Sequence, residues 1–242
     1  MPEKFKNYIQ PQDHDEKLKQ QTEQKEVLLT AARWAQAKDL TRIFEIEKRS
    51  YPPYLQATHK ILEERLDAFG ILVAEDKDGK IYGFSTMVPA TLPWDNEQEL
   101  FYTIMNNRHP HYHPWLDQYK KGADFNINTL WVMSTAVESG FQNKGVGGTL
   151  IEESLRIAKE KGLSYRASAL KCEYAHKRIP NETIKHYIER VVSGEVQDRF
   201  LQPYIKRGFQ LSLSLPNYEP DHPSRRSESE VNYNILAYNK IK

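Results

Sequence analysis

One segment constrains the fold of this chain more than any other. The apolar residues 130–133 are followed by a polar, glycine-rich stretch at residues 142–148 and then by a segment with helical periodicity. Small and apolar residues recur in that segment at the spacing of one helix face, and Gly162 ends the pattern. These residues are Val146, Leu150, Ile151, Ser154, Leu155 and Ala158. The sequence therefore predicts a strand, a loop and a helix in that order.

A glycine-rich loop at the start of a helix is suited to binding phosphate. The first backbone N–H groups of the helix lack partners, and the helix dipole adds positive potential there. Two common phosphate loops are excluded. Gly140 and Gly145 have the spacing of a P-loop, but Val146 and Gly147 stand where that motif needs Lys and Ser or Thr. The dinucleotide motif needs Gly or Ala where Leu150 stands. What remains is a Gln-x-x-Gly-x-Gly pattern.

Between a strand and an amphipathic helix, this pattern resembles the coenzyme A pyrophosphate loop of the GNAT superfamily of N-acetyltransferases. A second segment, residues 204–209, reads Tyr-Ile-Lys-Arg-Gly-Phe and resembles the Tyr-x-Lys-x-Gly-Phe segment that these chains carry where a late helix turns into a strand. The front of the chain agrees, because residues 27–33 predict a first strand and residues 40–46 a following helix. The resemblance extends in order from about residue 27 to residue 238.

A closer resemblance exists to GNAT domains that are fused to carbon–nitrogen hydrolases. Residues 178–180, 191–198 and 215–224 look like segments of that subgroup. Residues 175–177 read Ala-His-Lys, however, where the subgroup usually carries a glycine-rich turn. No hydrolase set of Glu, Lys and Cys is identifiable, so this second resemblance supports only the fold.

The resemblance implies an α+β fold of mixed α/β character. Its central sheet is twisted and mostly antiparallel, with about seven strands, helices on both faces, and strands four and five that splay apart. The residue pattern also predicts a helix around residues 61–69, four strands and a hairpin turn. The strands are at residues 71–75, 81–88, 126–137 and 165–170, and the hairpin turn is at Asp78-Gly79. We expect a polar arm over residues 1–25 and one domain over residues 26–242.

An aromatic stretch at about residues 89–123 looks like an insertion between the third and fourth strands. Its pattern is irregular, and long insertions in compact domains are more often functional than idle. Aromatic side chains such as Trp94 and Trp115 can wall a pocket.

The resemblance also implies acetyl-CoA as co-substrate, with no metal. The pantetheine arm would lie along the end of the fourth strand, where backbone N–H and C=O groups are expected to be free because the neighbouring strand splays away. A backbone N–H there can stabilise an oxyanion by roughly 3 kcal/mol. In the loop, Gly145 and Gly147 have no side chain to hold the phosphates away, and Lys144 can add a charged contact. The predicted cofactor-binding residues are Thr135, Ala136, Val137, Gln142, Asn143, Lys144, Gly145, Val146, Gly147, Gly148 and Thr149.

The resemblance assigns Tyr204 the role of the acid that protonates the departing thiolate. The alternative is a tyrosine that packs with its hydroxyl at the surface, since the chain has 14 tyrosines. The amine must also lose a proton before it attacks. Some GNAT enzymes carry a carboxylate on the fourth strand, but this chain has the neutral residues Asn126, Asn128, Thr129 and Ser134 there. The remaining candidates for the base are Glu138, Glu173, His109, His111 and His113.

Two other groups could carry chemistry. Cys172 is the single cysteine, which excludes an internal disulfide, and it is more simply a small buried residue than a nucleophile. His109, His111 and His113 could bind a metal, but Pro110 places them in a loop whose conformation the sequence does not predict. A substrate-lining or surface loop is favoured.

Composition fits a cytoplasmic enzyme. The chain has 242 residues, a net charge of +1 and a mean hydropathy of -0.74. It shows neither an apolar run of membrane-spanning length nor a hydrophobic leader, so no membrane association is expected. Basic residues are mixed with acidic ones, which argues against nucleic acid as a ligand. We therefore expect an acetyl-CoA-dependent N-acetyltransferase in which a small-molecule or peptide amine attacks directly. The alternative is a non-catalytic acyl-CoA-binding or protein-interaction module. A monomer and a homodimer both remain open.

Overall fold

The structure is a computed structural model that describes residues 29–107, 115, 117, 121, 126–219 and 233–241. The predicted polar arm lies outside these residues. The strands are β1 (Leu29–Trp34), β2 (Ile71–Asp76), β3 (Ile81–Ala90), β4 (Thr129–Val137), β5 (Tyr165–Lys171), β6 (Gln210–Pro216) and β7 (Tyr233–Lys240). The helices are α2 (Leu40–Ser50), α3 (His59–Ala68), α4 (Glu97–Asn106), α6 (Val146–Glu160), α7 (Tyr174–Lys177), α8 (Ile184–Val192) and α9 (Gln202–Ile205). Short 3-10 helices occupy Ala37–Asp39 and Pro53–Leu55.

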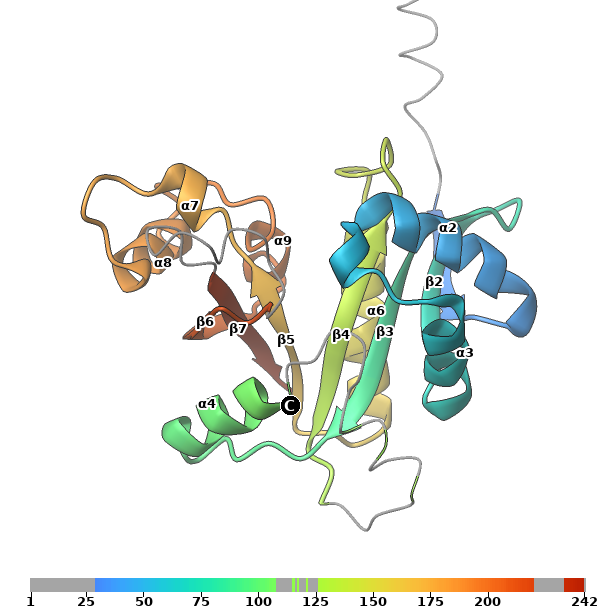
Figure 1. The fold of residues 1–242 in the computed structure, drawn as a ribbon, viewed down its shortest axis with the longest axis horizontal. Helices are drawn as coiled ribbons and strands as arrows, with labels where there is room; N and C mark the ends of the chain where they lie inside the picture. The colour runs from blue at the N-terminus through green and yellow to red at the C-terminus, as the bar shows by residue number, and fades with distance from the viewer. Residues whose placement is uncertain are drawn as a thin grey trace, which may run out of the picture.

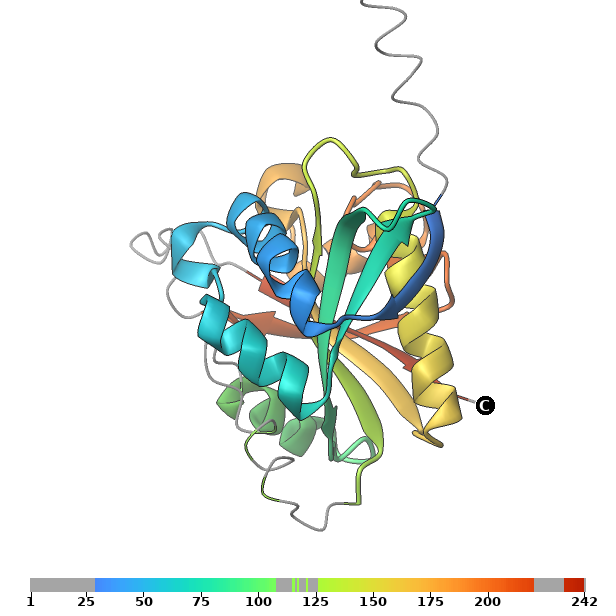
Figure 2. The ribbon, with the colours of Figure 1, turned by 90° about the vertical axis from the view of Figure 1, so that its right-hand side faces the viewer.

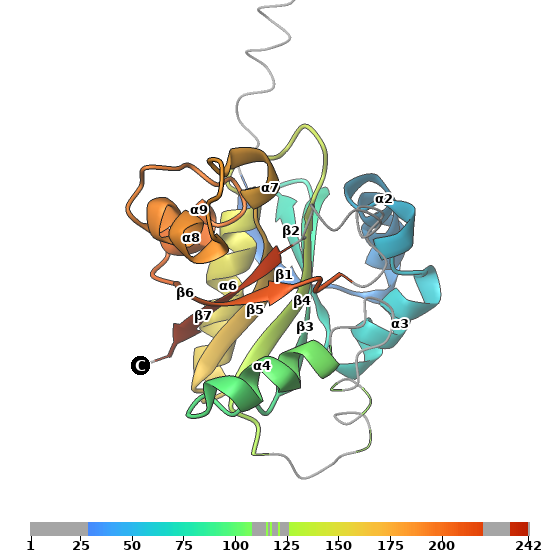
Figure 3. The same cartoon turned by 60° about the vertical axis from the view of Figure 1, so that its left-hand side comes forward.

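The strands form one seven-stranded sheet in the order β1-β2-β3-β4-β5-β7-β6 (Figure 1). Neighbouring strands are antiparallel except β4 and β5, which are parallel. Helices α2 and α3 cover one face, while α6, α8 and α9 lie on the other (Figures 2 and 3). The expected mixed fold with a mostly antiparallel sheet of seven strands is confirmed. Across the described residues, every helix is too short or too polar for a transmembrane span.

Helix α6 approaches the sheet closely because β3 has a glycine beneath it. A Cβ atom on Gly83 would lie 2.7 Å from Val146 Cγ1 and 2.8 Å from the Ala136 carbonyl oxygen. Any larger residue would push the first turn of α6 away from β3 and β4. The apolar face of α6 packs on β2, β3 and β4 as its periodicity predicts, and Gly162 with φ of 67° follows its end. The packing thus fixes the helix N-terminus beside the end of β4.

Helix α2 is joined to the end of β4 by ion pairs with the buried Glu138. Arg49 Nη1 lies 2.8 Å from Glu138 Oε1, and Arg42 Nη2 binds the other carboxylate oxygen. Arg42 Nε also donates to the Ile81 carbonyl oxygen at 3.1 Å. These bonds fix the C-terminal turn of α2 over the last residues of β4.

The insertion differs from the irregular stretch expected at residues 89–123. Strand β3 continues to Ala90, and α4 follows it, so the first part of the insertion is regular. Trp94 Nε1 donates to the Thr129 hydroxyl at 2.8 Å, and the Trp94 ring stacks on Tyr165 at 4.3 Å. Trp115 packs edge-on against Trp131 at 5.3 Å. These tryptophans therefore extend the core on the α4 side of the sheet.

Strand β4 begins at Thr129, three residues later than the strand expected from residue 126. The Asn128 N–H still donates to the Ala90 carbonyl oxygen at 3.2 Å, but beyond Ala90 the side-chain amide of Asn128 takes over the pairing, with Leu92. Its Oδ1 accepts from Leu92 N at 3.1 Å, and its Nδ2 donates to the Leu92 carbonyl oxygen at 2.8 Å. A side-chain amide that pairs with main chain in this way ends a ladder instead of continuing it.

Candidate functional site

Strands β4 and β5 diverge after three paired positions. The pairs are Thr129–Tyr165, Leu130–Arg166 and Trp131–Ala167, and a last link runs from the Ser168 hydroxyl to the Val132 carbonyl oxygen at 2.9 Å. Beyond this point β5 stays paired with β7, whereas β4 stays paired with β3 (Figure 1). The expected splay between the fourth and fifth strands is confirmed. It leaves residues 133–137 of β4 without a strand partner on one edge.

The loop between β4 and α6 has the backbone that the glycine pattern predicts. Asn143 and Gly145 both lie in the left-handed region, with φ of 62° and 90°. The first helical bond runs from Thr149 N to the Gly145 carbonyl oxygen at 3.0 Å. The helix therefore supplies no acceptor for the N–H groups of Val146, Gly147 and Gly148. Gly145 is exposed, so an anion can approach this group of donors from solvent.

An added side chain at the different glycines of the loop would contact different neighbours. A Cβ on Gly147 would meet only Val137 Cγ2 at 3.8 Å, an ordinary contact, so packing alone does not require glycine there. A Cβ on Gly148 would instead overlap Arg207 Nη2. Arg207 Nε is held at 2.9 Å from Glu152 Oε1. The sequence analysis did not identify Arg207, which brings a guanidinium to the first turn of α6.

The remaining loop side chains lie close to the loop itself. Gln142 and Asn143 are exposed. Lys144 Nζ lies 4.8 Å above the Phe141 ring, and the Thr149 hydroxyl contacts the Gly145 carbonyl oxygen at 3.4 Å. Val146 is buried and contributes only its backbone to the surface of the loop. All the loop residues predicted from the sequence thus gather at the N-terminus of α6.

The edge of β4 is less open than the sequence analysis expected. The Tyr51 hydroxyl donates to the Thr135 carbonyl oxygen at 2.9 Å, and the Ser50 hydroxyl reaches the Val137 carbonyl oxygen at 3.4 Å. The expectation of free carbonyl groups is therefore wrong here, because the end of α2 occupies them. The N–H and C=O of one strand residue point the same way, so the N–H groups of Thr135 and Val137 also face the divergence. Ala136 pairs with β3, and its methyl group is buried.

Tyr204 lies on α9 and is only 7% exposed, so most of its side chain is buried. Its ring packs edge-on against Phe209 at 5.2 Å. Tyr51 follows the last residue of α2, and α2 and α9 lie on opposite sides of the sheet (Figure 3). Burial raises the pKa of Tyr51, and the nearby Glu47 and Tyr204 raise it further. The two phenols are therefore within electrostatic reach of each other across the end of β4.

The carboxylates considered as bases are engaged in ion pairs. Glu138 holds the two arginines of α2 described above. Glu173 lies 2.6 Å from Lys177 Nζ and 3.3 Å from Arg199 Nε. Burial acts to raise the pKa of Glu173, but the bonds from Lys177 and the Arg199 backbone lower it overall. Glu173 is thus stabilised as an anion by its partners, and Glu138 is held by its ion pairs. His109, His111 and His113 lie outside the described residues.

Glu47 was missed by the sequence analysis. It is 2% exposed, and its Oε1 accepts from Ala57 N at 2.7 Å. Its Oε2 has no hydrogen-bond partner within the described part of the chain. Burial raises the pKa of Glu47, although the Ala57 N–H and Arg65 oppose the shift. The signal was present, because Glu47 stands one turn before Tyr51 and beside Ile46 and Ile43 on the apolar face of α2.

Cys172 behaves as the small buried residue that was expected. Its Sγ contacts the Tyr233 carbonyl oxygen at 3.3 Å. Burial raises the pKa of the Cys172 thiol to about 12, so the reactive thiolate is disfavoured.

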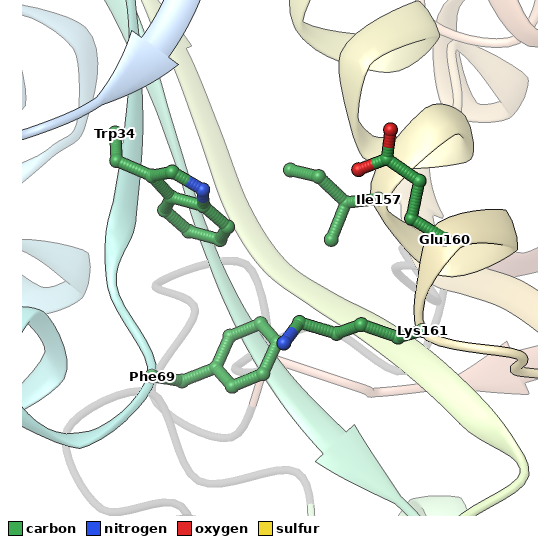
Figure 4. A pocket seen from close by; sticks show the side chains of 5 residues that line it. All are labelled: Trp34, Phe69, Ile157, Glu160 and Lys161. Atoms are coloured by element: carbon green, nitrogen blue, oxygen red, sulfur yellow. The ribbon is translucent and has the colours of Figure 1, made fainter.

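A separate pocket of ≈ 470 Å³ lies at the other end of α6 (Figure 4). It is lined by Trp34, Phe69, Ile157, Glu160 and Lys161. It is distinct from the divergence of β4 and β5 and contains none of the predicted site residues.

The loop, the divergent strands and the buried tyrosine can be compared with known proteins. The model of the acetyltransferase (GNAT) family matches residues 39–179, which is more than half of the chain. The chain belongs to the GNAT family. A search of curated protein sequences finds no significant match. Membership in this family supports an acyl-CoA-dependent acetyltransferase.

Solved structures agree with this fold. One is the GphF GNAT-like decarboxylase in complex with isobutyryl-CoA, which is 18% identical, with a TM-score of 0.63 over 87% of this chain and 99% of that chain. Another is the loading GNATL domain of CurA from Lyngbya majuscula, which is 17% identical, with a TM-score of 0.65 over 87% of this chain and 96% of that chain. At such identities the likeness of this GNAT protein to them concerns the fold.

Proposed function

We propose that this GNAT protein transfers an acyl group, with acetyl as the reference case, from coenzyme A to a primary amine by direct attack. The observation that carries the proposal is the divergence of β4 from β5, which ends at the phosphate-type loop of α6. Tyr204 and Tyr51 lie at the two sides of this divergence. A thioester on β4 would therefore have an anion site at one end and buried hydroxyls beside it.

The pyrophosphate would bind at the N-terminus of α6. The N–H groups of Val146, Gly147 and Gly148 and the helix dipole favour an anion there. The Arg207 guanidinium lies at the same turn, where it is paired with Glu152. The pantetheine arm would then run along the unpaired edge of β4, towards the N–H groups of Val137 and Thr135.

The transfer step uses main chain and one phenol. The amine nitrogen forms a bond to the thioester carbon, and the carbonyl oxygen becomes negative. A single well-aimed N–H donor, from Thr135 or Val137, stabilises such an oxyanion by roughly 3 kcal/mol. The C–S bond then breaks, and its electron pair goes to sulfur, which takes a proton from the Tyr204 hydroxyl. The phenolate of Tyr204 accepts the proton that remains on nitrogen, so the acid is restored.

Glu47 is the carboxylate that we assign to the first proton transfer. A primary amine is mostly an ammonium ion at neutral pH and must lose one proton before attack. Glu47 has an oxygen without a hydrogen-bond partner and a pKa that burial raises, both of which suit a base near neutral pH. The N–H bond of the ammonium breaks as the O–H bond on Glu47 forms, and Glu47 releases this proton to solvent before the next turnover.

A second candidate is decarboxylation of an acyl-CoA that carries a free carboxylate. It is favoured by the described strand β4, which offers Thr129, Ser134 and Thr135 but no carboxylate to deprotonate an amine. The GNAT-like decarboxylase named above also shares this fold. In this reaction the bond to the carboxylate carbon breaks, and its electrons move to the thioester oxygen. Tyr204 would then protonate the resulting carbon, and no base for an amine is needed.

One experiment separates the two reactions. The purified protein is given acetyl-CoA with a mixed panel of amines, and free thiol and acetamide products are measured. In parallel, malonyl-CoA is supplied without amine, and carbon dioxide release is followed. Amine-dependent thiol release supports acyl transfer, whereas carbon dioxide from malonyl-CoA supports decarboxylation. Absence of both thiol release and carbon dioxide release, with acetyl-CoA still bound, would favour the non-catalytic module.

A further inference from the structure

Arg166 is a buried cation without an acidic partner in the described part of the structure. It lies on β5 and is 1% exposed. Its Nε donates to the Ser154 hydroxyl at 3.0 Å, but its Nη1 has no hydrogen-bond partner among the described residues. A buried charge that is not paired costs several kcal/mol of stability. The presence of Arg166 therefore calls for a group that benefits from its charge.

The surroundings of Arg166 indicate which group this is. The guanidinium carbon lies 5.1 Å from the ring centroid of Tyr204 and 4.9 Å from that of Phe209. Burial lowers the pKa of Arg166, and the Tyr204 hydroxyl is the group that opposes this shift. The guanidinium thus lies against the residue that is assigned to protonate the leaving thiolate.

Arg166 also has a fixed position in the fold. It pairs with Leu130, one position before the last pair at which β4 and β5 are joined. Ser154 is fully buried, donates to the Ile151 carbonyl oxygen at 2.7 Å and accepts from Arg166 Nε. The side chain is therefore held at the vertex of the divergence by α6 on one side and by two aromatic rings on the other.

We infer that Arg166 is a positioning residue for Tyr204, whose ring it holds and whose phenolate it stabilises after the hydroxyl has protonated the departing sulfur. This inference rests on the proposed function. The guanidinium is already positive before the reaction, so the step converts a neutral phenol beside a cation into an ion pair. The phenolate then takes the remaining proton from nitrogen, and the pair returns to its first state.

If Arg166 had a purely structural role, its replacement by an apolar side chain would not lower kcat. An apolar side chain of similar length would fill the same space without a buried charge, and such replacements are often neutral or stabilising. The function of Arg166 would appear only when negative charge develops on Tyr204. Its loss should therefore lower kcat and leave the KM for acetyl-CoA and the stability of the fold unchanged.

The first test does not require an acceptor. Ultraviolet absorbance of phenolate is followed while the pH is raised, and the difference between the protein and Tyr204→Phe isolates Tyr204. The same difference is measured in the Arg166→Met background. We expect the Tyr204 phenolate to form at lower pH when Arg166 is present. Formation at the same pH in both backgrounds would overturn the inference.

The second test is a double-mutant cycle on turnover. Arg166→Met should lower kcat by about ten- to a hundredfold, a large part of what a general acid supplies. The same substitution in Tyr204→Phe should have no further effect, since its target is gone. Arg166→Lys should restore part of the rate. Independent losses that multiply in the double variant would contradict the inference.

Two controls complete the design. Arg156→Met removes an exposed arginine of α6 that pairs with Glu153 and Glu160, and it should leave kcat unchanged. Thermal unfolding of Arg166→Met should occur at the same or a higher temperature, and a loss of several degrees with normal kcat would indicate a structural role. If the unaltered protein fails to bind acetyl-CoA, the proposed function fails, while the phenolate titration still decides the contact between Arg166 and Tyr204.

Discussion

The candidate site at the β4–β5 divergence has two parts, a cofactor side and a chemical side, and they are built in different ways. The cofactor side is one continuous stretch, residues 138–149, and it presents main-chain N–H groups whose arrangement depends on glycine conformations. The chemical side consists of buried side chains from α2, β5 and α9, and two of them, Glu47 and Arg166, have a polar atom without a hydrogen-bond partner among the described residues. Binding should therefore respond to backbone shape on one side, and turnover should respond to charge and protons on the other.

The largest effect is expected at the loop. Gly145→Glu places a carboxylate and a strained left-handed residue where the pyrophosphate would bind, so acetyl-CoA affinity should fall on the order of a hundredfold or more. Calorimetry measures the affinity, and circular dichroism checks the fold. Gly140→Glu is the matched control, because Gly140 has φ of 87° and an added Cβ would meet nothing within 4 Å. Equal binding by both variants would remove the loop from the cofactor site.

The next effect belongs to Tyr204. Tyr204→Phe should lower kcat by about a hundredfold, as loss of a general acid does, with little change in acetyl-CoA affinity. Tyr187→Phe is a suitable control, because the Tyr187 hydroxyl donates to buried Asp198 at 2.7 Å and should affect stability alone. The two sides would not be separable if Tyr204→Phe weakened coenzyme binding as strongly as it slowed turnover.

A smaller effect is expected from Glu47, and it depends on pH. Its carboxylate form accepts the proton, and burial raises its pKa, so turnover should rise with pH at values above those of an ordinary glutamate. Arg65 from α3, Tyr51 and Tyr204 are the charged or titratable groups whose interactions reach this site. Glu47→Gln should lower kcat by about tenfold and remove this acidic limb.

The pH profile of Glu47→Gln is compared with that of Glu45→Gln. Glu45 lies on the same helix with its side chain about half exposed, 48%, and it should leave both rate and profile unchanged. An unaltered acidic limb in Glu47→Gln would show that another group takes the proton from the amine.

The smallest effect distinguishes a glycine that serves the ligand from one that serves the fold. Gly147→Ala has room for its methyl group beside Val137, so the free energy of unfolding should stay the same or rise by up to about 1 kcal/mol. Acetyl-CoA affinity should nevertheless fall several-fold, because the added methyl group would crowd a pyrophosphate bound at the first N–H groups of α6. Lower stability with normal binding would reverse this assignment.

Much of the fold could be predicted because its signals are local. Apolar runs predicted β2 and β3, and helical periodicity with a glycine stop predicted α6. Helix α4 was missed, since its aromatic residues and flanking prolines obscured the periodicity. The start of β4 was placed too early, because the Asn128 amide pairs with Leu92, a contact distant in sequence.

The residues of the candidate site also divide into those that local sequence patterns predict and those that depend on tertiary packing. The loop could be predicted because a main-chain anion site requires glycines at fixed spacing. Glu47 and Arg166 could not be assigned roles, because their importance comes from burial and from the lack of a partner, and both depend on tertiary packing. No role of its own was predicted for Arg207, which stood only as one residue of the segment 204–209. Its contact with Gly148 joins α6 to the residues that follow α9.

The central claim is that the divergence of β4 and β5, with the loop at its end, is an acyl-CoA site. The most direct test is a calorimetric titration of acetyl-CoA into the purified protein, with coenzyme A and NAD as comparisons. We expect micromolar binding of acetyl-CoA, weakened by Gly145→Glu but not by Gly140→Glu, and no binding of NAD. Absence of acetyl-CoA binding would contradict the loop assignment and, with it, the proposed transferase.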